Sequence, residues 1–175
     1  MQAAILNQYH KHDVALSIID VPMPTINADQ VLVKSLAAGV NPVDNMITRG
    51  EVKLIIPYQL PIVAGNEIVG EIVALGANVS GFKKGDRVFA RLPLIHPGAF
   101  AQFVAIDSHA IAKVPAYLSN EEAAAIPLTA LTAMQAFFRT DGCSTWQKAF
   151  HFRRHRWFWR DGNSTGQSDG ALRDH

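Results

Sequence analysis

The chain has 175 residues, a formal net charge of +1 at pH 7 and a hydrophobic fraction of 49%. This composition supports a folded domain with an apolar core and gives no reason to expect a nucleic-acid or membrane partner. The single cysteine, Cys143, excludes an internal disulfide and any metal site built from several cysteines. No apolar run reaches the roughly 20 residues that span a bilayer, and Met1–His12 lacks a signal-peptide pattern. We therefore expect a cytoplasmic protein.

Short strands separated by turn residues are predicted over most of the first hundred or so positions. The pattern of Gln30–Ala37 alternates between two faces, and Gly70 interrupts another apolar segment, where it predicts a bulge or a close backbone approach. Many short strands with turns between them predict a mostly β fold with some α, a barrel or a sandwich. The candidate strands are Gln2–Leu6, Gln30–Ala37, Ile68–Leu75, Arg87–Ala90 and Phe100–Ile106.

The pattern becomes helical at Ser119. Glu122 follows Ser119 at the spacing of a capping box, which predicts a helix over Glu121–Ala125. Pro127 should end this helix. A second helix is predicted over Thr129–Phe138, with one face formed by Leu131, Met134, Gln135 and Phe138.

Five motifs follow one another over residues 1–138: Gly39–Asp44 (GVNPVD), Gly65–Gly70 (GNEIVG), Val79–Phe89 (VSGFKKGDRVF), Gly98–Phe103 (GAFAQF) and Ala123–Ala136. In this order they resemble the zinc-independent, quinone-oxidoreductase-like branch of the medium-chain dehydrogenase/reductase superfamily. The resemblance implies a GroES-like barrel over residues 1–115 and a helical link over 116–138. It also implies a Rossmann domain further on, which binds NADPH and supplies hydride to a small quinone or enone.

The resemblance carries over few functional residues. Asn41 resembles the family residue whose amide lies near the nicotinamide and the substrate, and Asp44 is expected to position the same loop. The alternative is that Asn41–Pro42 forms a plain turn, since both residues favour turns. Thr129 resembles a threonine that contacts the nicotinamide amide, although it also fits a cap for the helix after Pro127. Asn41 and Asp44 are thus the candidate catalytic residues, and Asn41 and Thr129 the candidate cofactor-binding residues.

No metal is expected. Zinc-dependent relatives have Cys at the position of Asn41 and His at that of Asn66, and asparagine supplies neither a thiolate nor an imidazole. His96 and His109 are expected to be loop or surface residues, because no second ligand type lies at a useful spacing.

Two further side chains have open interpretations. Glu67 is expected to face solvent or to form a salt bridge within a strand, rather than to support the site as a buried carboxylate. Tyr58 either lines the substrate cleft or packs beside Pro57.

Residues 139–175 break the pattern. This segment contains all three tryptophans and the cysteine, and its basic residues outnumber its acidic ones. It has no sustained strand or helix period, and Gly162, Gly166 and Gly170 do not have the G-x-G-x-x-G spacing of a dinucleotide site. We therefore expect an aberrant, poorly ordered tail, a missing or incomplete cofactor domain, and a chain that is inactive by itself.

A frameshift is one hypothesis for this tail. One permitted set of codons for His155–Arg160, read one base later, encodes Thr-Gly-Gly-Phe-Gly, which is the glycine-rich turn that the family requires. The single tryptophan codon, TGG, limits the freedom of this choice. The nucleotide sequence around the codon for Phe138 would decide the question.

Two other functions remain open from the sequence. Phe150–Arg160 interleaves basic and aromatic residues, as nucleic-acid stacking sites do, although the near-neutral total charge argues against it. Alternatively, an isolated GroES-like barrel serves as a non-enzymatic interaction module, or forms a homo-oligomer, through apolar surface.

Overall fold

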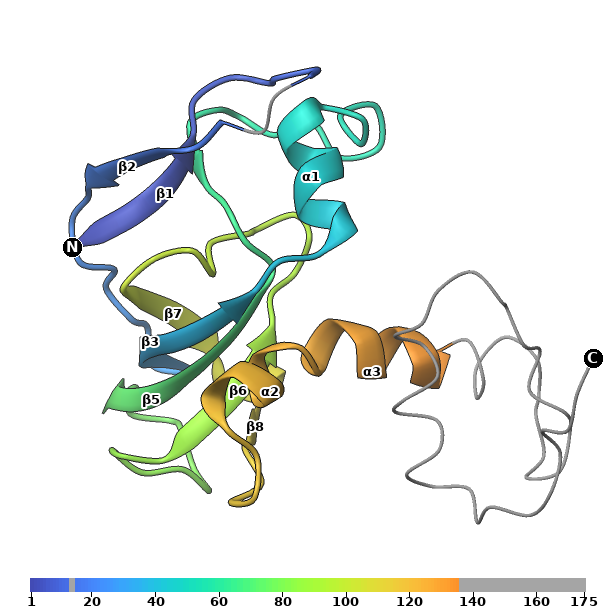
Figure 1. Cartoon of the computed structure of the whole chain (residues 1–175). Coiled ribbons are helices and arrows are strands. Elements are labelled where there is room, and N and C mark those ends of the chain that lie inside the picture. The colour runs from blue at the N-terminus through green and yellow to red at the C-terminus, as the bar shows by residue number, and fades with distance from the viewer. Residues whose placement is uncertain (13–14, 136–175) are drawn as a thin grey trace, which may run out of the picture. The chain divides into compact units, whose positions relative to one another are not determined.

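Strands dominate the described part of the chain, which is residues 1–12 and 15–135 of the computed structural model (Figure 1). In the unit Met1–Pro127 they form a three-stranded sheet of order β2-β1-β4 and a five-stranded sheet of order β7-β3-β5-β6-β8. This arrangement confirms the predicted mostly β, GroES-like fold. The strands are β1 (Gln2–Leu6), β2 (Ser17–Asp20), β3 (Gln30–Gly39), β4 (Ile62–Val63), β5 (Glu67–Leu75), β6 (Arg87–Arg91), β7 (Phe103–Asp107) and β8 (Ile111–Lys113).

The two sheets are joined beside β1. Ala3 forms an isolated antiparallel bridge with Ala101, and the backbone N–H of Ala4 donates to the carbonyl of Phe100 at 2.8 Å. Both sheets contribute side chains to one apolar core, and burial of such surface is the main favourable term in folding. The buried core residues are Ala3, Ile5, Val31, Val33, Ile68, Ile72, Val88, Ala90, Leu92, Ala99, Ala101, Val104, Ile106 and Ile111.

The central pair of strands, β3 and β5, follows the predicted pattern. Val31 and Val33 are fully buried, whereas Lys34 is exposed. Gly70 makes the close backbone approach that was one of the two alternatives predicted for it, and a register shift lies beside it on β3. A Cβ at this position would collide with the backbone carbonyl of Lys34, and the register of the pair shifts between Ser35 and Ala37.

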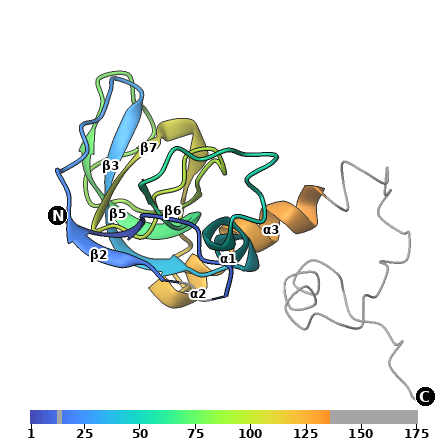
Figure 2. The same ribbon diagram turned by 90° about the horizontal axis from the view of Figure 1, so that it is seen from above.

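The described residues form three α-helices, α1 (Pro42–Arg49), α2 (Asn120–Ala124) and α3 (Pro127–Met134), and one short 3-10 helix, η1 (Ser108–Ala110). The capping box predicted for α2 is confirmed, because Glu122 N–H donates to Ser119 Oγ at 3.1 Å and Ser119 N–H donates to Glu122 Oε2 at 2.9 Å. This short helix packs across β3 and β5, as the views in Figures 1 and 2 show. Of the predicted second helix, Thr129–Phe138, α3 covers the part up to Met134, and residues 136–138 lie outside the described residues.

The α1 helix was not predicted, although its sequence signals are present. Asn41 stands at the N-cap, Pro42 opens the first turn, and Gly50 ends the helix with a left-handed φ of 73°. Proline at the first position and glycine just past the last are typical of helices. The segment is therefore a helix start and not the plain turn that was the alternative.

A second unit begins at Leu128, and only its first residues are described. The predictions for residues 139–175, including the poorly ordered tail, the frameshift and the nucleic-acid-binding segment, lie outside the described residues. The proposed boundaries at 115 and 138 stay predictions. No helix within the described residues is long and apolar enough to cross a bilayer.

Candidate functional site

Four buried polar residues gather where α1 meets the start of β5. Asn41 and Asp44 belong to the first turn of α1, while Asn66 and Glu67 stand at the start of β5. Each is at most 6% exposed. Buried polar groups are costly unless they are hydrogen-bonded, so the contacts among the four decide what the site can do. We refer to these four residues as the polar cluster.

Asp44 joins the helix start to β5. Its Oδ2 accepts the backbone N–H of Asn41 at 2.7 Å, and its Oδ1 accepts from Asn66 Nδ2 at 2.6 Å. The backbone carbonyl of Asp44 accepts from Thr48 Oγ1 at 2.8 Å, one turn further along α1. Asp44 therefore links the backbone at the start of α1 to Asn66 at the start of β5.

Burial raises the pKa of Asp44 above its ordinary value of 3.8, because the charged form loses its hydration. The hydrogen bonds from the Asn41 backbone and from the Asn66 side chain act in the opposite direction, but less strongly. The carboxyl of Asp44 is thus held in place by donors while burial opposes its ionisation.

Glu67 makes the second link of the polar cluster. Its Oε1 accepts from Asn41 Nδ2 at 2.6 Å, and the residue is 1% exposed. This burial corrects the expectation that Glu67 faces solvent, while the expected salt bridge stays a prediction. The sequence signal for burial was the apolar run that follows in β5, and a carboxylate inside such a run needs a donor from another element.

Gly39 explains how the carboxylate of Glu67 fits. Gly39 and Glu67 are register partners on β3 and β5. A Cβ at Gly39 would collide with Glu67 Oε1 and would lie 2.7 Å from the backbone oxygen of Ala124 in α2. Glycine is therefore required at this position for the close approach of the carboxylate.

Asn66 is fully buried, and its Oδ1 has no hydrogen-bond partner. The backbone around it is fixed, because Leu92 N–H donates to the Asn66 carbonyl at 2.7 Å. The role of Asn66 within the polar cluster was not predicted from the sequence, where this residue was used only to argue against zinc.

The two amide nitrogens of the polar cluster are not available to a metal ion. Asn41 and Asn66 each direct an amide nitrogen at a carboxylate oxygen, and an amide nitrogen that donates a hydrogen bond has no lone pair for a metal. Within residues 1–12 and 15–135, no group of three His, Cys, Asp or Glu side chains lies close enough to hold a metal ion.

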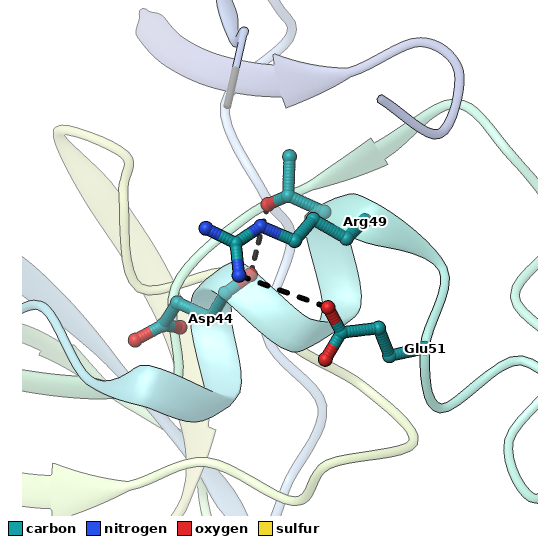
Figure 3. Close-up of polar contacts among 4 residues, drawn as sticks. Asp44, Arg49 and Glu51 are labelled. Atoms are coloured by element: carbon teal, nitrogen blue, oxygen red, sulfur yellow. Dashed lines mark hydrogen bonds and ion pairs between the residues drawn. The ribbon is translucent and has the colours of Figure 1, made fainter. Parts of the chain in front are cut away.

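An exposed ion pair stands at the opposite end of α1, although Ile47 and Thr48 in the same turn are buried. Arg49 and Glu51 form an ion pair with an N–O distance of 3.7 Å, and their side chains are 40% and 47% exposed. Figure 3 shows the carboxylate of Asp44 pointing away from this pair. One short helix thus has a buried polar cluster at its start and an exposed ion pair at its end.

Tyr58 is half-buried, and its hydroxyl donates to the carbonyl of Leu94 at 2.6 Å. Burial raises the pKa of Tyr58 above its ordinary 10.0, and the negative charges of Tyr9 and Asp44 act in the same direction. The hydrogen bond ties the loop after α1 to the loop after β6. The two readings of Tyr58 from the sequence, cleft or packing, stay predictions.

The remaining candidates lie apart from the polar cluster or in the second unit. His96 and His109 are exposed, as expected for loop histidines. Thr129 is half-buried in α3 and belongs to the unit that begins at Leu128, so its predicted contact with a nicotinamide stays a prediction.

Residues 27–116 match the family model described as the alcohol dehydrogenase GroES-like domain. The chain is 34% identical over 142 residues to a chloroplast envelope quinone oxidoreductase homolog of Arabidopsis thaliana, covering 81% of the chain and 43% of the relative. It is 36% identical over 141 residues to the 2-methylene-furan-3-one reductase of Solanum lycopersicum, covering 77% and 36%.

Among solved structures, a mycobacterial protein complexed with NADPH superposes with a TM-score of 0.71 at 30% identity, covering 81% of this chain and 42% of that one. The chain therefore spans about two fifths of the length of the relatives that it matches.

Proposed function

Because the chain belongs to the alcohol dehydrogenase GroES-like family, with quinone oxidoreductases of the medium-chain dehydrogenase/reductase superfamily as relatives, we propose that it is the substrate-side part of an NAD(P)H-dependent quinone or enone reductase. The observation that carries the proposal is the polar cluster, which holds Asn41 at the start of α1 through Asp44 and Glu67. The names of the relatives supply the substrate class, quinone or enone.

Hydride transfer is proposed to proceed without zinc. The polar cluster consists of two amides and two carboxylates and contains neither a thiolate nor an imidazole, and the amide nitrogens of Asn41 and Asn66 donate to the carboxylates. Catalysis of this kind depends on positioning, since the nicotinamide supplies the hydride and the protein supplies orientation and electrostatics. Asn41 is the proposed ligand-contacting residue, and Asp44 is proposed to hold it at the helix start.

We propose that the chain has no reductase activity by itself. The described residues contain no glycine-rich strand–turn–helix that could hold a dinucleotide pyrophosphate, so we assign no cofactor-binding step to them. A cytoplasmic location and the frameshift origin of residues 139–175 stay predictions.

A chimaera tests the proposal. Residues 1–127 are joined to the cofactor domain of the Arabidopsis relative, and NADPH oxidation is followed with 1,4-naphthoquinone. The 175-residue chain should show no turnover, whereas the chimaera should reduce the quinone. Asn41→Ala in the chimaera should lower kcat/KM roughly tenfold or more, the loss expected for one hydrogen bond.

Asn78→Ala is the matched control, because Asn78 is an exposed asparagine on the loop after β5. A folded chimaera that binds NADPH but reduces neither the quinone nor an enone would refute the proposed function.

A further inference from the structure

We propose that Glu67 is a positioning residue that fixes the amide of Asn41 in one of its two orientations. The structure shows the hydrogen bond between Asn41 and Glu67 directly. The consequence for ligand binding rests on the proposed function, in which Asn41 contacts the ligand.

The orientation follows from the chemistry of the two groups. An ionised carboxylate only accepts hydrogen bonds, while an asparagine amide has a donating and an accepting end that are nearly equal in shape. Glu67 Oε1 lies 2.6 Å from the Asn41 amide nitrogen, and rotating the amide by half a turn would place two oxygens in contact. The carboxylate therefore excludes the rotated form and leaves Asn41 with one N–H and its Oδ1 in defined directions.

The position of the carboxylate is itself restricted. Glu67 lies opposite Gly39 in the strand register, and the space beside Gly39 is filled by Glu67 Oε1 and the backbone oxygen of Ala124. Backbone from β3 and α2 thus borders the carboxylate, and backbone cannot move aside as a flexible side chain can. Asn41 is oriented against a fixed acceptor.

Asn66 independently shows, within the same cluster, that a carboxylate fixes the orientation of an asparagine amide. Its amide nitrogen donates to Asp44 Oδ1 at 2.6 Å, although its own Oδ1 then remains buried without a partner. An unpartnered buried acceptor is unfavourable. The amide nevertheless keeps this orientation, because the rotated form would direct Oδ1 at the Asp44 carboxylate. The carboxylate decides the direction of the amide in both pairs.

The test is NMR spectroscopy of the full 175-residue chain labelled with ¹⁵N and ¹³C. At pH 7, one side-chain amide proton of Asn41 should resonate downfield and show a coupling across the hydrogen bond to Glu67 Cδ, whose chemical shift should be that of a carboxylate. In Glu67→Gln, a side chain of the same size that permits both orientations, this proton should move upfield. It should also exchange with water at least about tenfold faster, since no strong bond must open first.

Glu71→Gln is the matched control. Glu71 lies on the same strand but is exposed, so its substitution should leave the Asn41 amide unchanged. The proposal is overturned if folded Glu67→Gln retains the Asn41 signal of the unsubstituted chain. If Glu67→Gln does not fold, the unsubstituted chain decides: an absent coupling to Glu67, or a protonated Glu67, overturns the proposal.

This readout does not depend on turnover. A chimaera without quinone reductase activity, in the presence of the Asn41–Glu67 coupling, would refute the proposed function and leave the positioning role of Glu67 intact. An active chimaera, together with an absent Asn41–Glu67 coupling, would refute only the positioning role of Glu67.

Discussion

The first turns of α1 and α2 use the same local hydrogen bond in different environments. At the start of α1, the backbone N–H of Asn41 donates to Asp44 at 2.7 Å, and at the start of α2, Ser119 N–H donates to Glu122 at 2.9 Å. The acid stands three positions after the N-cap in both helices. Asp44 is 6% exposed, however, whereas Glu122 is exposed.

Burial changes what the acid does. Glu122 satisfies a backbone donor on the surface, where water can replace it. Water cannot replace the buried carboxylate of Asp44. This carboxylate also accepts a hydrogen bond from the amide of Asn66 and so connects α1 to β5. A local capping device thus becomes part of a long-range polar cluster when tertiary packing encloses it. The following predictions test whether burial, and not the local motif, sets the energetic importance of each group.

The largest effect is expected from Asp44→Ala. It leaves the Asn41 N–H and the Asn66 amide without their acceptor, and each buried unpaired group costs about 1–3 kcal/mol. The free energy of unfolding in urea should fall by roughly 2–4 kcal/mol. The matched change Glu122→Ala should cost less than about 1 kcal/mol. Equal losses in the two variants would contradict the comparison.

Asp44→Asn should change the pH dependence of stability. Because burial raises the pKa of Asp44 above 3.8, the folded state binds this proton more tightly than the unfolded state. The contribution of Asp44 is therefore most favourable below about pH 4 and declines as the pH rises through its folded pKa.

The difference in unfolding free energy, wild type minus Asp44→Asn, should accordingly decrease with rising pH and then level off. Urea titrations at a series of pH values would measure it. A difference that grows with pH would show that the donors around Asp44 outweigh its desolvation.

Ser119→Ala removes the exposed cap of α2. The loss of the Glu122 N–H to Ser119 Oγ bond should cost about 1 kcal/mol, as for helix caps in general. Ser80→Ala, an exposed serine in the turn after β5, serves as the control and should be nearly neutral. Thermal unfolding would measure both, and a cost comparable to that of Asp44→Ala would remove the distinction between exposed and buried caps.

The smallest effect is expected from Glu51→Gln, just after the end of α1. Its ion pair with Arg49 is long and exposed, and such pairs contribute about 0–1 kcal/mol. The small loss in unfolding free energy should shrink further in high salt, because mobile ions screen exposed charges. A larger, salt-insensitive loss would mean that the whole helix, and not only its buried start, depends on charged contacts.

Much of the fold could be predicted because strand patterns and caps are local. The alternation of Val31 and Val33, the glycine at position 70 and the Ser119 cap were all visible in the sequence. The short strands β2, β4 and β8 were missed. All four residues of β2 are exposed, so the strand has no burial pattern, and β4 has only two residues.

The candidate site was predicted in part. Asn41 and Asp44 were identified, and the structure brings them into contact with each other. The buried position of Glu67 was considered but not favoured, because its partner Asn41 lies 26 positions away and a lone carboxylate at a strand start gives no local sign of its donor.

By itself the sequence determined the family, the apolar alternation of the central strands and the capping of α2, since each depends on residues near one another in the chain or on motifs in a set order. Only the tertiary structure decided that two asparagines and two acids form one buried cluster. The reason is physical: the pairing of β3 with β5 places Gly39 opposite Glu67. Burial then requires each polar group to find a partner wherever the fold has brought one within reach.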